Sequence, residues 1–94
     1  MGQVRAEKSR SKSVEVRTGF IMEKIAPFTE AFGENLNDIH YLGNPIDYVC
    51  FSEDSIVFVE VKTGKSRLSP KQNNIKKLVE DGRVEFKVVR YDYE

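Results

Sequence analysis

The sequence predicts a small α/β domain in which two helices cover a single sheet. Three observations lead to this prediction. Apolar residues recur at helical spacing near the start of the chain, two runs in its middle are rich in Val, Ile, Phe and Tyr, and a well-capped helix follows them. The order helix, strands, helix, strand is typical of domains in which helices pack on a sheet.

Composition and length are those of one ordinary globular domain, with 94 residues, 39% hydrophobic and 32% charged. No run of about 18 apolar residues is present, so we expect neither a membrane span nor a signal peptide. The single cysteine, Cys50, cannot form an internal disulfide. A lone cysteine indicates a reducing compartment, and we expect the cytoplasm.

The first helix is expected to begin near Ser13. Residues 1–12 are almost free of apolar side chains and rich in bases, so we expect a flexible basic arm ahead of a single domain over residues 13–94. The apolar residues at helical spacing are Phe20, Ile21, Ile25, Phe28 and Phe32. Pro27 should end or kink this helix because it lacks a backbone donor, and Gly33 is a suitable stop.

Strands come next. A short strand is expected at Ile39–Leu42, and the two clearest strands are Ile46–Phe51 and Ile56–Lys62, joined by the polar segment "SEDS". If the turn is centred on this segment, Phe51 faces Ile56, and the same register places Asp47 opposite Glu60.

The second helix carries clear start and stop signals. Ser69 is a good N-cap, Pro70 suits the first helical position, and Gln72 stands where a capping box has Glu or Gln. The apolar stripe consists of Ile75, Leu78 and Val79. Gly82 closes the helix, and the alternation within Val84–Tyr91 predicts a last strand.

Two opposed carboxylates within a sheet require an explanation. Directly opposed side chains have Cβ atoms ~4.5–5.5 Å apart, so Asp47 and Glu60 would repel each other. Lys62 lies on the same face as Glu60 and offsets part of this repulsion. A divalent cation would offset more, since Mg²⁺ prefers one or two carboxylates, and the Val61 carbonyl could add a ligand. The alternative is a solvated strand face with a Glu60–Lys62 pair and Asp47 as a turn residue.

Two further residues are candidates for the same site. Gln72 shares the inward stripe of the second helix, so it could hydrogen-bond a carboxylate or a phosphate as well as complete the capping box. Glu23 lies at the edge of the apolar face of the first helix, where it is either a site residue or an ordinary solvated glutamate.

The segments "GNPIDYVCF", "IVFVEVKTGKSRLSPKQ" and "VEDGRVEFKVVR" resemble the PD-(D/E)XK nuclease superfamily. More closely, the chain is similar to small endonuclease-like proteins related to archaeal Holliday-junction resolvases. In that pattern Asp47 and Glu60 match the two metal-binding acids, and Lys62 matches the catalytic lysine. Gln72 matches a glutamine of the following helix, and Glu23 in "RTGFIMEKIAPF" takes the place of the first-helix acid.

The resemblance covers roughly residues 15–91 and implies a restriction-endonuclease-like αβββαβ core, with a small mixed sheet flanked by two helices. It also implies Mg²⁺ or Mn²⁺ as cofactor, hydrolysis of DNA phosphodiesters, including those of branched or junction DNA, and a homodimer. Proteins of this group can carry a membrane segment ahead of the nuclease part, so tethering would require a longer chain than this one.

Basic residues flank an acidic middle. Residues 25–59 contain six acids and no Lys or Arg, whereas residues 60–90 contain nine bases and four acids. Such a pattern suits an acidic site rimmed by positive charge that binds a polyanion, although charged residues also decorate ordinary solvated faces. The candidate DNA contacts are Arg10, Lys12, Arg17, Lys65, Ser66, Arg67 and Lys71, and Arg5, Lys76 and Lys77 are further candidates.

The sequence therefore predicts a Mg²⁺-dependent deoxyribonuclease in which Asp47 and Glu60 hold the metal with help from Glu23. Lys62 and Gln72 would organise water and phosphate. The alternative is a binding or assembly module that uses the same fold on nucleic acid without turnover. The pattern does not distinguish junction, duplex or single-stranded DNA from RNA.

Overall fold

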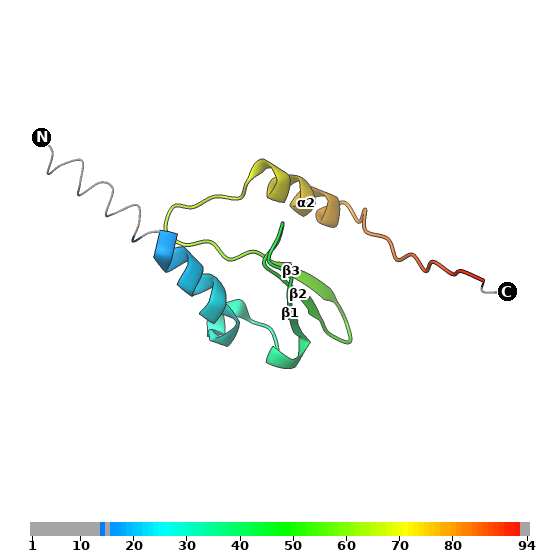
Figure 1. Ribbon diagram of the computed structural model, residues 1–94, viewed down its shortest axis with the longest axis horizontal. Coiled ribbons are helices and arrows are strands. Elements are labelled where there is room, and N and C mark those ends of the chain that lie inside the picture. The colour runs from blue at the N-terminus through cyan, green and yellow to red at the C-terminus, as the bar shows by residue number, and fades with distance from the viewer. Residues whose placement is uncertain (1–13, 15, 93–94) are drawn as a thin grey trace, which may run out of the picture.

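The computed structural model describes residue 14 and residues 16–92, and it consists of a helix, a three-stranded sheet and a second helix (Figure 1). Within this part of the chain, no helix is long and apolar enough to cross a membrane. The predicted basic arm of residues 1–12 and the expected helix start at Ser13 lie outside the described residues.

The first helix covers residues 16–25 and passes into the short 3-10 helix η1 (Ala26–Phe28). Pro27 stands in the first turn of η1, so the predicted end of the α-helix at this proline is confirmed. A second 3-10 helix, η2 (Glu30–Phe32), ends at Gly33, which has a φ of 76° and so takes the left-handed conformation expected of a helix stop.

The sheet is antiparallel in the order β1-β2-β3, with β1 at Ile39–Tyr41, β2 at Tyr48–Phe51 and β3 at Ile56–Val59. A 3-10 turn, η3 (Leu36–Asp38), leads into β1. Phe51 pairs with Ile56 and Tyr48 with Val59, so the predicted hairpin register is confirmed.

Strands β2 and β3 are shorter than predicted, because the ladder stops before Asp47 and Glu60. The N–H of Asp47 donates to Glu60 Oε1 at 3.0 Å, and the N–H of Val61 donates to Asp47 Oδ2 at 2.9 Å. These peptide donors therefore bind carboxylates in place of ladder carbonyls. Glu60 and Lys62 accordingly lie just beyond β3 and not inside it.

The core is centred on β2 and the residues before it. Cys50 is fully buried, Val49, Tyr48 and Ile46 are nearly so, and Ala26 joins them from η1. Tyr48 anchors the first helix, since its hydroxyl donates to the carbonyl of Glu23 at 2.6 Å. The first helix is thereby held against the sheet at the end where β2 begins.

The second helix, α2 (Pro70–Glu80), runs beside the sheet on the side of β3 (Figure 1). Its capping box is complete: Ser69 Oγ accepts from the N–H of Gln72, and Gln72 Oε1 accepts from the N–H of Ser69. The predicted start of this helix is confirmed. Gly82, with a φ of 70°, follows its C-cap, Asp81.

The predicted last strand, Val84–Tyr91, is not formed. These residues leave the end of α2 and run away from the sheet (Figure 1), so they meet no strand to pair with. The sheet of the described residues is therefore antiparallel throughout, whereas the expected mixed sheet required this fourth strand. Two helices around one small sheet nevertheless confirm the predicted α/β fold class.

Candidate active site

The structure brings the predicted acidic residues together at the end of the sheet where β2 starts and β3 stops. Asp47 lies in the bend before β2 and is only 7% exposed. Asp47 Oδ2 accepts from the N–H of Val61, while the N–H of Asp47 donates to Glu60. Each acid thus holds a backbone group of the opposing segment, and this reciprocal pair closes the open end of the hairpin.

Glu60 collects three donors from three segments. Its Oε2 accepts from Gln72 Nε2 at 2.9 Å and forms an ion pair with Lys62 Nζ at 3.1 Å. Its Oε1 accepts from the N–H of Asp47. The Glu60 side chain is 12% exposed, and that of Lys62 is 31% exposed, so the lysine reaches solvent while its partner is covered.

Gln72 fulfils both roles that its position suggested. While its Oε1 completes the capping box, its Nε2 donates to Glu60 Oε2 and to the carbonyl of Pro45, both at 2.9 Å. One amide side chain therefore ties the first turn of α2 to the segment after β3 and to the loop before β2.

Glu23 joins the site from the first helix. The Tyr48 hydroxyl holds its carbonyl, and Tyr41 Oη donates to its Oε1 at 3.4 Å. One turn earlier, a Cβ on Gly19 would lie 3.6 Å from Thr63 Oγ1, so this helix face approaches the segment after Lys62.

The electrostatic environment of the site is negative. Burial raises the pKa of Asp47 above its ordinary value, the N–H of Val61 lowers it, and the neighbouring Glu23 carboxyl raises it again. Burial also raises the pKa of Tyr48, and the charges of Glu23 and Asp47 raise it further. Two carboxyl groups therefore crowd one another, and a cation between them would relieve their repulsion.

A divalent metal fits the donor set that Asp47 and Glu23 offer. Within residues 14 and 16–92, no group of three or more His, Cys, Asp or Glu is arranged to hold a metal. Mg²⁺, however, is usually held by only one or two carboxylates, with water and phosphate oxygens completing its shell. Glu60 differs from the other two acids, since both of its oxygens already bind protein donors.

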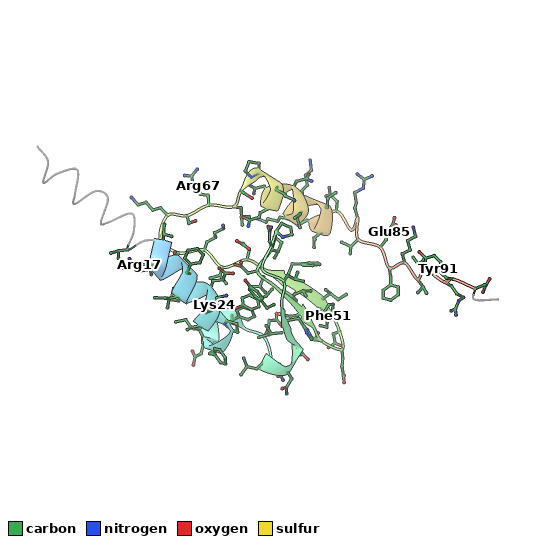
Figure 2. All side chains as sticks on the ribbon, viewed as in Figure 1. Arg17, Lys24, Phe51, Arg67, Glu85 and Tyr91 are labelled. Carbon is green, nitrogen blue, oxygen red and sulfur yellow. The ribbon has the colours of Figure 1, made fainter. Side chains whose placement is uncertain are left out.

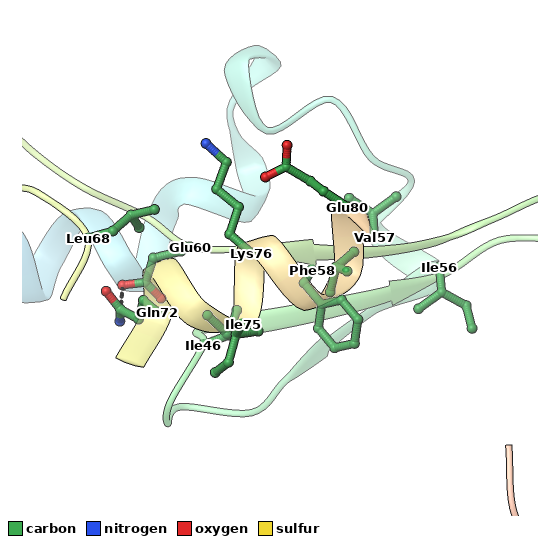
Figure 3. A pocket seen from close by; sticks show the side chains of 11 residues that line it. Ile46, Ile56, Val57, Phe58, Glu60, Leu68, Gln72, Ile75, Lys76 and Glu80 are labelled. Carbon is green, nitrogen blue, oxygen red and sulfur yellow. Dashed lines mark hydrogen bonds between the residues drawn. The ribbon is translucent and has the colours of Figure 1, made fainter. Parts of the chain in front are cut away.

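A cavity of about 390 Å³ lies between α2 and the sheet (Figure 3). Glu60 and Gln72 line one end of it, joined by their hydrogen bond, and Ile46, Phe58 and Ile75 line its middle. Apolar walls do not suit a phosphate backbone. The candidate site is therefore the acidic cluster of Glu23, Asp47 and Glu60 at the sheet end. The cavity adjoins this cluster through Glu60.

The predicted phosphate contacts divide into two groups. Those within the described part of the chain are exposed, namely Arg17, Lys65, Ser66, Arg67 and Lys71. Figure 2 shows Arg17 and Arg67 at the same end of the molecule, on the first helix and on the segment that leads into α2. Arg10 and Lys12, like Arg5, lie outside the described residues.

Sequence reasoning missed the two tyrosines that position Glu23 and the carbonyl of Pro45 that Gln72 binds. Tyr41 and Tyr48 lie directly opposite each other on β1 and β2. Their rings contact edge to face with centroids 5.5 Å apart. The signal available was a tyrosine immediately after Asp47 and a second one in the strand before it.

Comparison with known proteins identifies a family to which the chain is similar. The model of a family described as endonuclease related to archaeal Holliday junction resolvase matches residues 6–91. No curated protein and no solved structure matches the chain.

Proposed function

Since this chain belongs to the family of endonucleases related to archaeal Holliday junction resolvases, we propose that it is a metal-dependent endonuclease that hydrolyses DNA phosphodiester bonds. We further assign it to the PD-(D/E)XK superfamily, with branched or junction DNA among its substrates. The observation that carries the proposal is the convergence of Asp47, Glu60, Lys62, Gln72 and Glu23 at one end of the sheet.

Asp47 and Glu23 are the proposed metal ligands, with Glu60 and the carbonyl of Val61 as further ones. Crowding of the first two carboxyls supports this role, because the raised pKa of Asp47 reflects burial and the nearby Glu23. A bound Mg²⁺ or Mn²⁺ would polarise a phosphoryl oxygen and stabilise the charge that develops on the phosphate. We propose Mg²⁺ as the ion, with Mn²⁺ as the alternative.

Lys62 is the proposed residue that positions water or neutralises charge on the phosphate. Its ammonium is held by Glu60 Oε2 at 3.1 Å and is partly exposed, so it can reach a substrate at the rim of the site. Gln72 donates to the same oxygen and thereby fixes the Glu60 carboxylate. We propose that the Gln72 amide would also be a donor for a substrate phosphate.

A non-catalytic nucleic-acid-binding module is the second candidate, and the position of Glu60 favours it. Both oxygens of this carboxylate are occupied by protein donors, as expected of a structural residue. Thermal unfolding with and without Mn²⁺ separates the two functions. A metal at ~100 times its Kd should stabilise the fold by about 2.7 kcal/mol, whereas a module without a metal site should show no shift.

The direct test is a cleavage assay with Mg²⁺ or Mn²⁺ on a four-way junction, linear duplex, single-stranded DNA and RNA. The variant is Asp47→Asn, because an asparagine oxygen can still accept from the N–H of Val61 while the charge is lost. We expect cleavage to fall at least ~100-fold, since a group that stabilises transition-state charge contributes about that much. The folded state should be retained, because the repulsion with Glu23 is removed.

Glu30→Gln is the matched control, since Glu30 is an exposed acid in η2, outside the acidic cluster. It should cleave like the wild type. Equal cleavage by Asp47→Asn and the wild type would contradict the proposed site. Binding of DNA without cleavage by any form, and without a metal-induced shift, would establish the binding module.

A further inference from the structure

The C-terminal segment of residues 84–91 has the pattern of a strand but no partner in the described residues. Its apolar side chains alternate with charged ones at the start, and Val84, Phe86 and Val88 are 55%, 93% and 69% exposed. Apart from the cap of α2, no backbone hydrogen bond ties this segment to the rest of the described chain. Such an apolar extended segment is a surface that another strand would cover.

The direction in which this segment leaves α2 is well defined. The N–H of Gly82 donates to the carbonyl of Val79 at 3.1 Å, and the N–H of Arg83 donates to that of Leu78 at 2.9 Å. With Gly82 in the left-handed conformation, these two bonds form a Schellman motif. The chain therefore leaves a fully bonded helix end, and Figure 1 shows it continuing outward from there.

The sheet carries an exposed apolar surface on which such a segment could pack. β3 is one of the two edge strands of the order β1-β2-β3, so one side of it has no strand partner in the described residues. Beside it is an open hollow of about 770 Å³ whose apolar walls include Phe51, Ile56, Phe58 and Val79, and Val84, the first residue of the segment, lines it as well. Phe51 and Ile56 are 49% and 58% exposed, so α2 leaves this part of the face open.

Charge is complementary between the segment and this surface. Glu53 and Asp54, at the turn between β2 and β3, line the same hollow. The segment carries two bases, Lys87 and Arg90, against one acid, Glu85. An incoming strand that pairs with β3 would bring this positive excess near the acidic turn.

We propose that the occupant is a second copy of this chain: two molecules exchange residues 84–91, and each segment adds a strand to the free edge of β3 in the other molecule. A strand of the same chain would have the advantage of a high effective concentration, yet Val84 alone of the segment lines the hollow, and the chain then continues away from its own β3. Reciprocal exchange of one element is a low-cost route to a two-fold dimer.

This inference does not depend on nuclease activity, because it concerns the edge of the sheet next to the β2–β3 turn and not the acidic cluster. It does, however, give the homodimer expected from the resemblance a definite interface. The exchanged strand would extend the sheet to four strands and cover apolar side chains that a domain of 94 residues otherwise leaves exposed.

The test combines molar mass by light scattering after size exclusion with hydrogen exchange of backbone amides. The wild type should be a dimer in which both residues 84–91 and the outer amides of β3 are protected. Phe86→Asp should raise the dimer dissociation constant roughly 100-fold, because a buried aromatic contact is replaced by a charge. Protection of both regions should be lost together in this variant.

Phe28→Asp is the matched control, since Phe28 is 75% exposed but belongs to η1 and not to the hollow. It should remain dimeric. A monomeric wild type with protected residues 84–91 would overturn the proposal in favour of closure on its own β3. A dimer that survives Phe86→Asp, or one in which the segment is protected but β3 is not, would also overturn it.

Discussion

Asp47 is the buried charged residue of the described chain, and its environment shows how one carboxylate can serve fold and site together. It accepts from the N–H of Val61 and presents its own N–H to Glu60. These bonds end the sheet ladder and at the same time hold two acids at a fixed place. The structural and the chemical interpretations of the sequence are therefore compatible at this position.

Gly43 supports the same region through its lack of a side chain. Its φ is 85°, and a Cβ there would lie 2.9 Å from Tyr41 Oη, the group that donates to Glu23. The N–H groups of Leu42 and Gly43 both donate to the carbonyl of Asp47. A side chain at Gly43 would therefore disturb both the tyrosine and the loop that carries Asp47.

We predict that Gly43→Ala lowers the free energy of unfolding by more than Gly64→Ala. Both glycines have positive φ, so both substitutions carry the ~1–2 kcal/mol cost of a left-handed alanine. Only Gly43 adds a contact with Tyr41, because nothing lies within 4 Å of the Cβ position at Gly64. Urea denaturation of both variants measures the difference, and equal losses would show that Tyr41 moves aside freely.

At the scale of the elements, α2 is joined to the site through its first turn. Ser69 and Gln72 cap the helix, and Gln72 continues to Glu60 and Pro45. Loss of the cap and loss of the bridge are therefore separable by mutation, since different atoms of Gln72 serve each.

We predict that Ser69→Ala lowers the free energy of unfolding by about 1 kcal/mol, the usual cost of a lost N-cap. Gln72→Glu should keep the capping box, since a carboxylate oxygen can still accept from the N–H of Ser69, but it should lower the free energy of unfolding by roughly 1–3 kcal/mol because the donor to Glu60 and Pro45 is lost. Adding Glu60→Gln should recover part of this loss by exchanging donor and acceptor. Urea unfolding measures all three, and no recovery in the double variant would argue against the bridge.

For the whole molecule, the distribution of charge matters more than the net charge of zero. Arg17 lies on the first helix, which supplies Glu23 to the acidic cluster, and Arg67 lies on the segment that leads into α2, while Glu85 and Tyr91 lie at the opposite end (Figure 2). This arrangement suits binding of a phosphate backbone across the acidic site, with bases at its rim.

We predict that Arg67→Ala weakens DNA binding for all sequences and reduces the slope of log K against log salt by about 1, as expected for one lost phosphate contact. Arg83→Ala, two residues before Glu85 at the opposite end, should leave the slope unchanged. Fluorescence anisotropy across a salt series measures both slopes. Identical slopes for Arg67→Ala and the wild type would place the DNA elsewhere.

The sequence alone determined the elements whose signals are local. Proline and glycine ended the first helix, Ser69 and Gln72 began α2, and β-branched runs with a polar turn set the hairpin register. These features are predictable because each depends on residues a few positions apart. The same register, continued past the ends of the two strands, brings Asp47 beside Glu60.

Only the tertiary structure decided where the strands end, how Glu23 reaches Asp47, and what becomes of residues 84–91. The ladder ends at Asp47 because carboxylates capture its peptide donors, and Glu23 is placed by tyrosines from two other strands. The last strand illustrates the physical reason most clearly. Its alternating pattern specifies an extended backbone, but a strand forms only where another backbone edge is within reach.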